Sequence, residues 1–146
     1  MWHHGLMAKL YSRGVSGKLL PWLQSYLSNR SIRVVLSGQA SEPCSINASV
    51  PQGSVLGPFL FSIFIDDLVE VCENELYMYA DDSTLFARIR SPADRAEVEA
   101  SLNRDLQQIT IWGDRWKTTF EPTKCKFMTH SRKRTPSLLR WAPSDT

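Results

Sequence analysis

Two adjacent carboxylates, Asp81 and Asp82, are the residues of this sequence whose chemistry is easiest to name. They lie between two short hydrophobic segments, residues 75–79 and 84–87, which are typical of the two strands of a β-hairpin. Carboxylates fixed on a tight turn can hold divalent metal ions for phosphoryl transfer. Asp is also a common turn residue, and taken alone the pair more often marks an ordinary hairpin tip.

A second candidate site lies upstream, in a loop at residues 51–58 that is punctuated by Pro and Gly. In this loop Gly53 permits unusual backbone dihedrals and close approach of a ligand. Gln52 can both donate and accept hydrogen bonds. A plain turn between a strand and a helix would use Pro51 and Gly53 in the same way, so the loop alone leaves both interpretations open.

The letters VPQGSVLGPFLFSIFIDDL at residues 50–68, followed by YMYADD at residues 77–82, carry more information together. They closely resemble the reverse transcriptases of non-LTR (LINE-type, jockey-like) retrotransposons, and the resemblance extends over about residues 2–133. It implies an α+β fold, a partial polymerase palm in which a small antiparallel sheet carries the Asp-Asp hairpin and packed helices cover one face. It also implies the activity of an RNA-directed DNA polymerase.

The resemblance assigns roles to the residues of the hairpin. Asp81 matches the first metal-ligating Asp of the family's YxDD motif, and Asp82 matches its neighbour, so both are candidate catalytic and metal-binding residues. Tyr79 and Ala80 are expected at the primer end. Because adjacent side chains of a strand point to opposite faces, we expect Asp81 to matter more than Asp82.

Roles outside the hairpin also follow from the resemblance. Pro51, Gln52 and Gly53 match the PQG motif, which lies beside the incoming nucleotide and the template. Lys124 aligns with a lysine that could assist the leaving pyrophosphate. This sequence has Glu121 where the family commonly has Asn, and an exposed lysine kept for solubility is the alternative interpretation of Lys124.

The implied cofactor is a pair of Mg²⁺ (or Mn²⁺) ions, and the implied partners are an RNA template, a DNA primer and deoxynucleoside triphosphates. In relatives, a further metal-binding Asp lies in a Phe-Asp motif just ahead of a Val-Trp-His segment. This sequence starts at Met1, directly before Trp2 and His3, so we expect that carboxylate to be missing. The resulting expectation is a fragment with little or no polymerase activity of its own.

Two other functions remain open. The chain could be a non-catalytic remnant that binds nucleic acid or a protein through exposed sheet edges and apolar surface. An RNA-templated RNA polymerase shares the palm, but Ala80 between Tyr79 and Asp81, together with the PQG motif, favours a reverse transcriptase. Some of the basic residues are candidates for contacts with nucleic-acid phosphates: Arg30, Arg33, Lys124, Lys126, Arg132, Lys133 and Arg134.

The elements that would position the sites begin with two helices, at residues 5–11 and 17–27. Ser16 is the expected N-cap of the second helix, and Trp22 and Tyr26 are expected to pack in the core. Strands are predicted at residues 31–36 and 44–50, joined by a turn at Gly38-Gln39, and a buried helix at residues 58–71. Asp66 and Asp67, late in that helix, are not assigned to catalysis.

The second half begins with the hairpin and continues with a long helix from Ser91-Pro92 to about Trp116. Its charged residues, Asp105 among them, are predicted to face solvent. A last strand is predicted at residues 124–129. We expect one palm domain at residues 1–133 and an irregular tail at residues 134–146.

Composition fits this organisation. The chain has 146 residues, of which 42% are hydrophobic and 22% charged, with a net charge of +2, as expected for one globular domain. No apolar run is long enough to cross a membrane. Cys44, Cys72 and Cys125 are far apart and odd in number, which favours free thiols, no disulfide and an intracellular setting, nuclear or cytoplasmic.

Overall fold

The computed structural model describes residues 1–130, so the predicted tail at 134–146 lies outside the described residues. The described chain is a mixture of helices and small antiparallel sheets, which confirms the α+β class. Its α-helices are α1 (His3–Ser12), α2 (Leu19–Leu27), α3 (Leu56–Ile65) and α4 (Arg95–Trp116), and its 3-10 helices are η1 (Asp66–Val71), η2 (Pro92–Asp94) and η3 (Pro122–Lys124).

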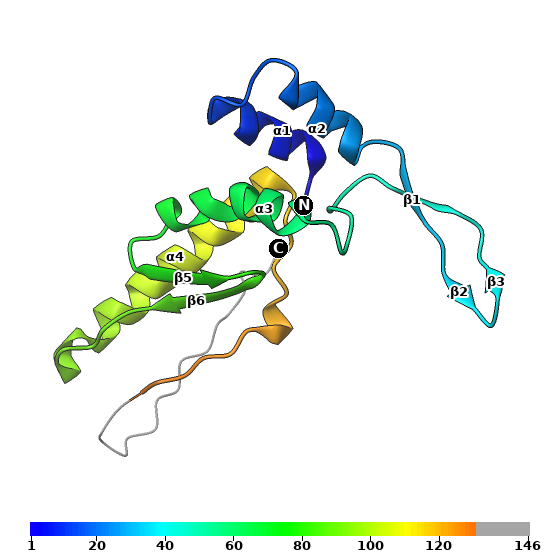
Figure 1. Cartoon of the computed structure of the whole chain (residues 1–146). Coiled ribbons are helices and arrows are strands. Elements are labelled where there is room, and N and C mark those ends of the chain that lie inside the picture. The colour runs from blue at the N-terminus through cyan, green and yellow to red at the C-terminus, as the bar shows by residue number, and fades with distance from the viewer. Residues whose placement is uncertain (131–146) are drawn as a thin grey trace.

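The hydrophobic core lies where α1 packs on α2 and α3, and where α4 packs on η1 (Figure 1). The α3 segment is nearly continuous in its hydrophobic sequence, which is typical of a helix that packs on more than one side. The buried hydrophobic residues come from every helix of the core: Leu6, Leu10, Leu23, Leu27, Leu60, Phe64, Ile65, Leu68 and Trp112.

A buried lysine joins three of these elements. Lys9 of α1 is 4% exposed, and its Nζ donates to Asp67 Oδ1 (2.5 Å) and to the Phe64 carbonyl (2.6 Å). Trp112 of α4 donates its Nε1–H to the same Asp67 oxygen (2.9 Å). The rings of Phe64, Trp112 and Trp116 surround the ammonium with centroids 4.0–4.9 Å away, a distance typical of cation–π contacts. Burial lowers the pKa of Lys9, and the hydrogen bond to Asp67 opposes that shift.

Within residues 1–130, the strands form three two-stranded antiparallel sheets. One pairs β1 (Arg30–Ile32) with β4 (Cys44–Ile46), one pairs β2 (Val35–Leu36) with β3 (Gln39–Ala40), and one pairs β5 (Glu75–Tyr79) with β6 (Asp82–Phe86). The first two continue one another and form an arm that extends away from the helices, whereas β5 and β6 lie beneath α3 and α4 (Figure 1).

The arm differs from the prediction in three respects. The expected strand at residues 31–36 is interrupted at Arg33-Val34, where the Val34 amide donates to the Ser41 hydroxyl and not to a backbone carbonyl of the partner strand. The partner strand ends at Ile46 and not at Val50. The turn is at Ser37-Gly38, one residue earlier than predicted, and both residues have the positive φ (51° and 78°) that a type I′ turn demands.

The start of α2 also differs from the prediction. Gly17 has φ +64°, which lies outside the helical region, so the helix begins at Leu19 and Ser16 is not its N-cap. Trp22 is 52% exposed and stacks on Tyr26 at the surface, because Leu23 and Leu27 form the buried side of the helix.

The N-cap predicted at Ser91 is present, but it opens one turn of 3-10 helix, η2, and α4 follows from Arg95 to a well-defined end. Ser91 Oγ accepts from Ala93 N, and Asp94 accepts from Ser91 N, so the two form a capping box. The end is a Schellman motif, in which Thr118 N donates to the Gly113 carbonyl (2.8 Å) and Lys117 adopts φ +55°. A Cβ at Gly113 would lie 2.6 Å from the Thr118 carbonyl oxygen, so glycine is required there.

Three further differences concern α3, α4 and the segment after α4. The buried helix begins at Leu56 and changes to 3-10 geometry at Asp66, so it is not one helix to residue 71. Asp105 is fully buried and does not face solvent. The strand predicted at residues 124–129 is wrong, since the chain there has one turn of 3-10 helix and then no regular structure up to residue 130.

The three cysteines are free thiols, as predicted. Within the described residues, no helix combines the length and the apolar character needed to cross a membrane.

Candidate active-site hairpin

The β5–β6 hairpin places the two candidate carboxylates at its tip. Its ladder pairs Glu75 with Phe86 at one end and Tyr79 with Asp82 at the other, so Ala80 and Asp81 form a two-residue turn. Asp82 is therefore the first residue of β6, while Asp81 belongs to the turn. Both side chains are exposed.

The turn has a specific backbone geometry. Ala80 has φ +53°, whereas Asp81 has a negative φ, and these are the φ signs of a type II′ hairpin turn. Such a turn follows the right-handed twist of the strands, but its first position normally favours Gly. The structure thus holds Ala80 in a left-handed conformation in order to present Asp81 at the outermost point of the hairpin.

The hairpin has one packed face and one exposed face. Leu76 and Met78 alternate inward and pack against the core, and Leu85 on β6 lines a small apolar pocket together with Leu106 and Ile109 of α4. Tyr77 and Tyr79 point outward and are 59% and 84% exposed. The period-two alternation of the sequence therefore determines which face docks on the helices.

The base of the hairpin is tied to α4 by Asp105. Its carboxylate accepts hydrogen bonds from the backbone amides of Glu73 (2.7 Å) and Asn74 (3.0 Å) and from the Asn74 side chain (2.7 Å). Beside it, burial and the charge of Asp105 raise the pKa of the Cys72 thiol to about 11. Because the base is fixed and the inner face is packed, the helices determine where the tip lies.

Two exposed carboxylates match the ligand type that Mg²⁺ prefers, since this ion takes oxygen donors and keeps several waters. They do not match the number of ligands for a complete two-ion site. Within residues 1–130, no group of three or more His, Cys, Asp or Glu side chains could hold a metal ion. The hairpin tip therefore presents two carboxylates, fewer than a complete two-ion site requires.

The loop before α3 forms a second well-defined turn. Ser54 N donates to the Pro51 carbonyl (3.2 Å), and Gly53 has φ +77°, which is the left-handed conformation that a type II turn needs at this position. Gln52 is exposed at the corner of the turn. The Ser54 hydroxyl then accepts from Gly57 N (3.0 Å) and caps the start of α3.

The loop is anchored from the start of the chain and not from the hairpin. Ser49 N donates to the Met1 carbonyl (2.8 Å), and His3 donates its Nε2–H to the Ser49 carbonyl (2.6 Å). Among the described residues, no hydrogen bond or ion pair joins this loop to the tip at Asp81.

Comparison with known proteins identifies the family. A family model described as "Reverse transcriptase (RNA-dependent DNA polymerase)" matches residues 1–138. The chain belongs to this reverse transcriptase family. It is 30% identical over 141 residues to the RNA-directed DNA polymerase from mobile element jockey of Drosophila melanogaster, covering 91% of the chain and 15% of the relative.

Two further relatives agree with this assignment. The probable RNA-directed DNA polymerase from transposon BS of Drosophila melanogaster is 34% identical over 139 residues, covering 85% of the chain and 14% of the relative. The jockey polymerase of Drosophila funebris is 31% identical over 137 residues, covering 88% and 14%. The chain thus spans about 15% of the length of these non-LTR retrotransposon relatives. No solved structure matches it significantly.

In this reverse transcriptase segment, Lys124 is an exposed residue at the end of η3. Glu121, which stands where the family commonly has Asn, caps that turn. Its carboxylate accepts hydrogen bonds from Thr123 Oγ1 (2.7 Å) and Thr123 N (3.2 Å). These bonds lower the pKa of the Glu121 carboxyl. Because Asn and Glu both offer a side-chain oxygen, the substitution retains an acceptor for the cap.

Three residues that tie the helices and the hairpin base together in this reverse transcriptase segment are not evident from the sequence motifs. Asp105 and Trp112 lie seven residues apart on the apolar stripe of α4, and Lys9 lies between the buried residues of α1. A charged residue on an apolar stripe is the signal that could have found Asp105 and Lys9, since burial of a charge requires a partner.

Proposed function

We propose that this chain contributes the carboxylate-bearing hairpin and the nucleotide-side loop of a polymerase palm that copies RNA into DNA. The observation that supports the proposal best is the tip of the β5–β6 hairpin, where a strained two-residue turn holds Asp81 and Asp82 outward on a docked base. The family match and the relatives' printed names supply the reaction class.

In this proposal, Asp81 and Asp82 hold Mg²⁺ or Mn²⁺. The two-ion pair would activate the primer 3′-hydroxyl and stabilise the leaving pyrophosphate. Tyr79 and Ala80 support the primer end, and Pro51, Gln52 and Gly53 contact the incoming nucleotide and the template. Lys124 neutralises charge on the pyrophosphate. The partners are an RNA template, a DNA primer and deoxynucleoside triphosphates.

We further propose that the chain alone has little or no polymerase activity. The tip supplies two carboxylates, and the residues described here add no third ligand. A two-ion site with too few bridging carboxylates binds its ions weakly, because each ligand lost leaves charge on the metal uncompensated.

Primer extension on an RNA template with Mg²⁺ or Mn²⁺ tests both parts of the proposal. The isolated chain should give no templated product. The jockey relative carrying this segment in place of its own should extend the primer, and Asp81→Asn in that protein should abolish extension. Asp114→Asn on the exposed side of α4 is the matched control and should leave extension unchanged. Extension that survives Asp81→Asn would refute the catalytic assignment.

A non-catalytic segment that binds nucleic acid is the second candidate. Two observations favour it: no group of three possible metal ligands occurs among residues 1–130, and the exposed arm carries Arg30 and Arg33. Binding through phosphates would weaken steeply as salt rises. Salt-independent self-association would instead indicate exposed apolar surface.

A further inference from the structure

The ion pair between Lys9 and Asp67 brings a charge into the core that the proposed polymerase site does not use. Lys9 is 4% exposed and the Asp67 side chain is 26% exposed, so the ammonium is the group that is removed from water. Burial is the largest influence on the pKa of Lys9 and lowers it, although the hydrogen bond and the charge of Asp67 act in the opposite direction. The cost of removing the ammonium from water therefore exceeds the gain from its attraction to Asp67.

A methionine in place of Lys9 would avoid that cost. Met has a similar unbranched stem and would pack against the same three rings, those of Phe64, Trp112 and Trp116, without a charge. Replacement of a whole buried ion pair by uncharged residues of similar volume is often neutral or stabilising, whereas loss of one partner is strongly destabilising. Stability alone is thus a poor explanation for the pair, and its directional bonds are what an apolar residue would lack.

The bonds of this pair join four helical elements. Asp67 of η1 uses one oxygen, Oδ1, to accept from Lys9 Nζ of α1 (2.5 Å) and from Trp112 Nε1–H of α4 (2.9 Å). Lys9 Nζ also donates to the carbonyl of Phe64 in α3 (2.6 Å). Hydrogen bonds fix a distance and a direction, whereas apolar contacts are non-directional and allow neighbouring helices to slide or rotate. The network therefore specifies how α1, η1 and α4 lie relative to one another.

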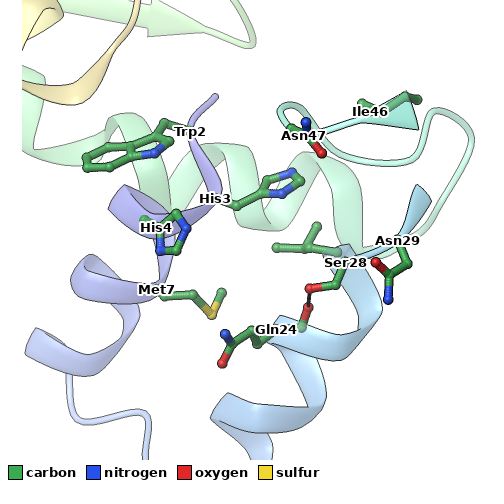
Figure 2. A pocket seen from close by; sticks show the side chains of 10 residues that line it. Trp2, His3, His4, Met7, Gln24, Ser28, Asn29, Ile46 and Asn47 are labelled. Carbon is green, nitrogen blue, oxygen red and sulfur yellow. Dashed lines mark hydrogen bonds between the residues drawn. The ribbon is translucent and has the colours of Figure 1, made fainter. Parts of the chain in front are cut away.

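The opposite side of α1 is packed less closely. Met7 is two residues before Lys9 and therefore about 200° around the helix from it. Together with His3 and His4, it borders a groove with a volume of about 460 Å³ between α1, the last turn of α2 and the end of β4 (Figure 2). Where α1 borders this groove it lacks close-packed neighbours, so dispersion contacts constrain it less there. The side of α1 that carries Lys9 supplies the stronger constraint.

The position of η1 bears on the hairpin because η1 leads into β5. Leu68, the residue after Asp67, is 0% exposed and lines the small apolar pocket together with Leu76 of β5. Just before β5, the amide of Asn74 donates to Asp105 of α4. The segment from Asp67 to Asn74 is therefore bonded to α4 at both of its ends, and the hairpin follows directly.

We propose that Lys9 and Asp67 are positioning residues for the hairpin tip: the buried pair gives α1, η1 and α4 a single relative position, at a cost in stability, and thereby fixes where Asp81 and Asp82 lie. The consequence for catalysis rests on the proposed polymerase function. The consequence for the hairpin does not, and it is tested on the chain alone.

The test removes both charges at once. Lys9→Met/Asp67→Asn preserves the size of both side chains and leaves an amide oxygen that can accept from the Trp112 indole. The midpoint of chemical denaturation should equal or exceed that of the unmodified chain. Hydrogen exchange at the amides of Glu73 and Asn74 should nevertheless become roughly 3- to 10-fold faster, the factor expected when local opening no longer breaks a hydrogen bond of ordinary strength.

The matched control is Arg13→Met/Asp66→Asn, which removes the exposed ion pair between the same two elements. It should change neither the midpoint nor the exchange at the hairpin base. If Lys9→Met/Asp67→Asn does not fold, Trp112→Phe keeps an aromatic ring and removes one donor to Asp67, and exchange at Asn74 should then accelerate more than exchange in α2. Exchange at Glu73 and Asn74 that stays unchanged, or that accelerates only as much as exchange in α2, would overturn the proposal.

Primer extension tests the consequence for catalysis, with the jockey relative that carries this segment. Lys9→Met/Asp67→Asn should lower kcat by up to about 100-fold, the effect of a small misplacement of reacting groups, and should leave the KM for the nucleotide nearly unchanged. An unchanged kcat, in a protein that Asp81→Asn inactivates, would refute the role in catalysis. Extension that survives Asp81→Asn would instead refute the proposed function, and the exchange measurements would still decide whether the pair positions the hairpin.

Discussion

The docked hairpin and the arm are both antiparallel ribbons with two-residue turns, yet their surroundings differ completely. Leu76 and Met78 of the docked hairpin pack against the core, and Asp105 fixes its base. In the arm, Val34 and Leu36 are 69% and 77% exposed, and neither face is covered within the described chain. Strand-forming residues produce a ribbon in both places, but only packing fixes where the ribbon lies.

This difference bears on function. An isolated two-stranded hairpin is at best marginally stable in water. Carboxylates at the tip of such a ribbon would have no fixed position with respect to a primer or a nucleotide. The proposed catalytic pair lies on the hairpin that the helices hold, so the precision of the site depends on contacts far from Asp81 and Asp82.

The largest expected effect comes from breaking the helical platform under the docked hairpin. Lys9→Ala leaves Asp67 without its buried cation and removes a link between α1, η1 and α4, so unfolding should become easier by about 3–5 kcal/mol. Chemical denaturation followed by circular dichroism measures the change. Arg13→Ala is the control, because it breaks the exposed pair with Asp66 and should cost at most about 1 kcal/mol. If both variants lose the same free energy of unfolding, the buried pair Lys9–Asp67 contributes no more than the exposed pair Arg13–Asp66.

A smaller effect is expected at the base of the same hairpin. Asp105→Ala removes the acceptor of two backbone amides, and leaving part-buried donors unpaired should cost about 2 kcal/mol. Hydrogen exchange at Glu73 and Asn74 should accelerate in the variant. Asp114→Ala on the exposed side of α4 should change neither stability nor exchange. Protection that persists at both amides would mean that packing, and not Asp105, holds the base.

The smallest effect is expected in the arm, and it tests the comparison directly. Leu36→Thr should change the free energy of unfolding by less than about 0.5 kcal/mol, since the side chain already contacts water. Leu76→Thr, the same substitution on the packed face of β5, should cost about 1–2 kcal/mol from lost apolar burial. Thermal unfolding of the two variants measures both losses of stability and so compares the arm with the docked hairpin. If Leu36→Thr costs as much as Leu76→Thr, the arm is packed in solution and the comparison fails.

Sequence patterns predict the features of the fold that are determined by residues close together in the chain. The turn at Asp81, the N-cap at Ser91 and the apolar segment of α3 each follow from neighbouring residues, and the structure contains all three. Features that depend on distant partners differ from the prediction. Asp105 is buried and not solvated, because the amides that donate to it lie on a segment about thirty residues away. Trp22 lies at the surface and not in the core, because periodicity alone does not show which side of a helix is covered.

The candidate site also combines features that neighbouring residues determine with features that depend on distant partners. The motif letters alone indicate Asp81, Asp82 and the loop at Gln52, and these assignments remain proposals. The anchor at Asp105 has no such signature in the sequence, because it bonds to Glu73 and Asn74, which become its neighbours only after α4 packs on η1. Pairings across such distances have no short-range signal in the chain.

The regular geometry of α4 also fixes the spacing between two residues that it carries, Asp105 and Trp112. Its 22 residues span about 33 Å at 1.5 Å per residue, the capping box at Ser91 fixes the 3-10 turn just before it, and the Schellman motif fixes its end. Asp105 and Trp112, two turns apart, therefore hold the hairpin base and the Asp67 network at a constant spacing and in the same angular phase. A one-residue insertion between them would rotate Trp112 by about 100° away from Asp67, and the two supports could no longer be engaged at once.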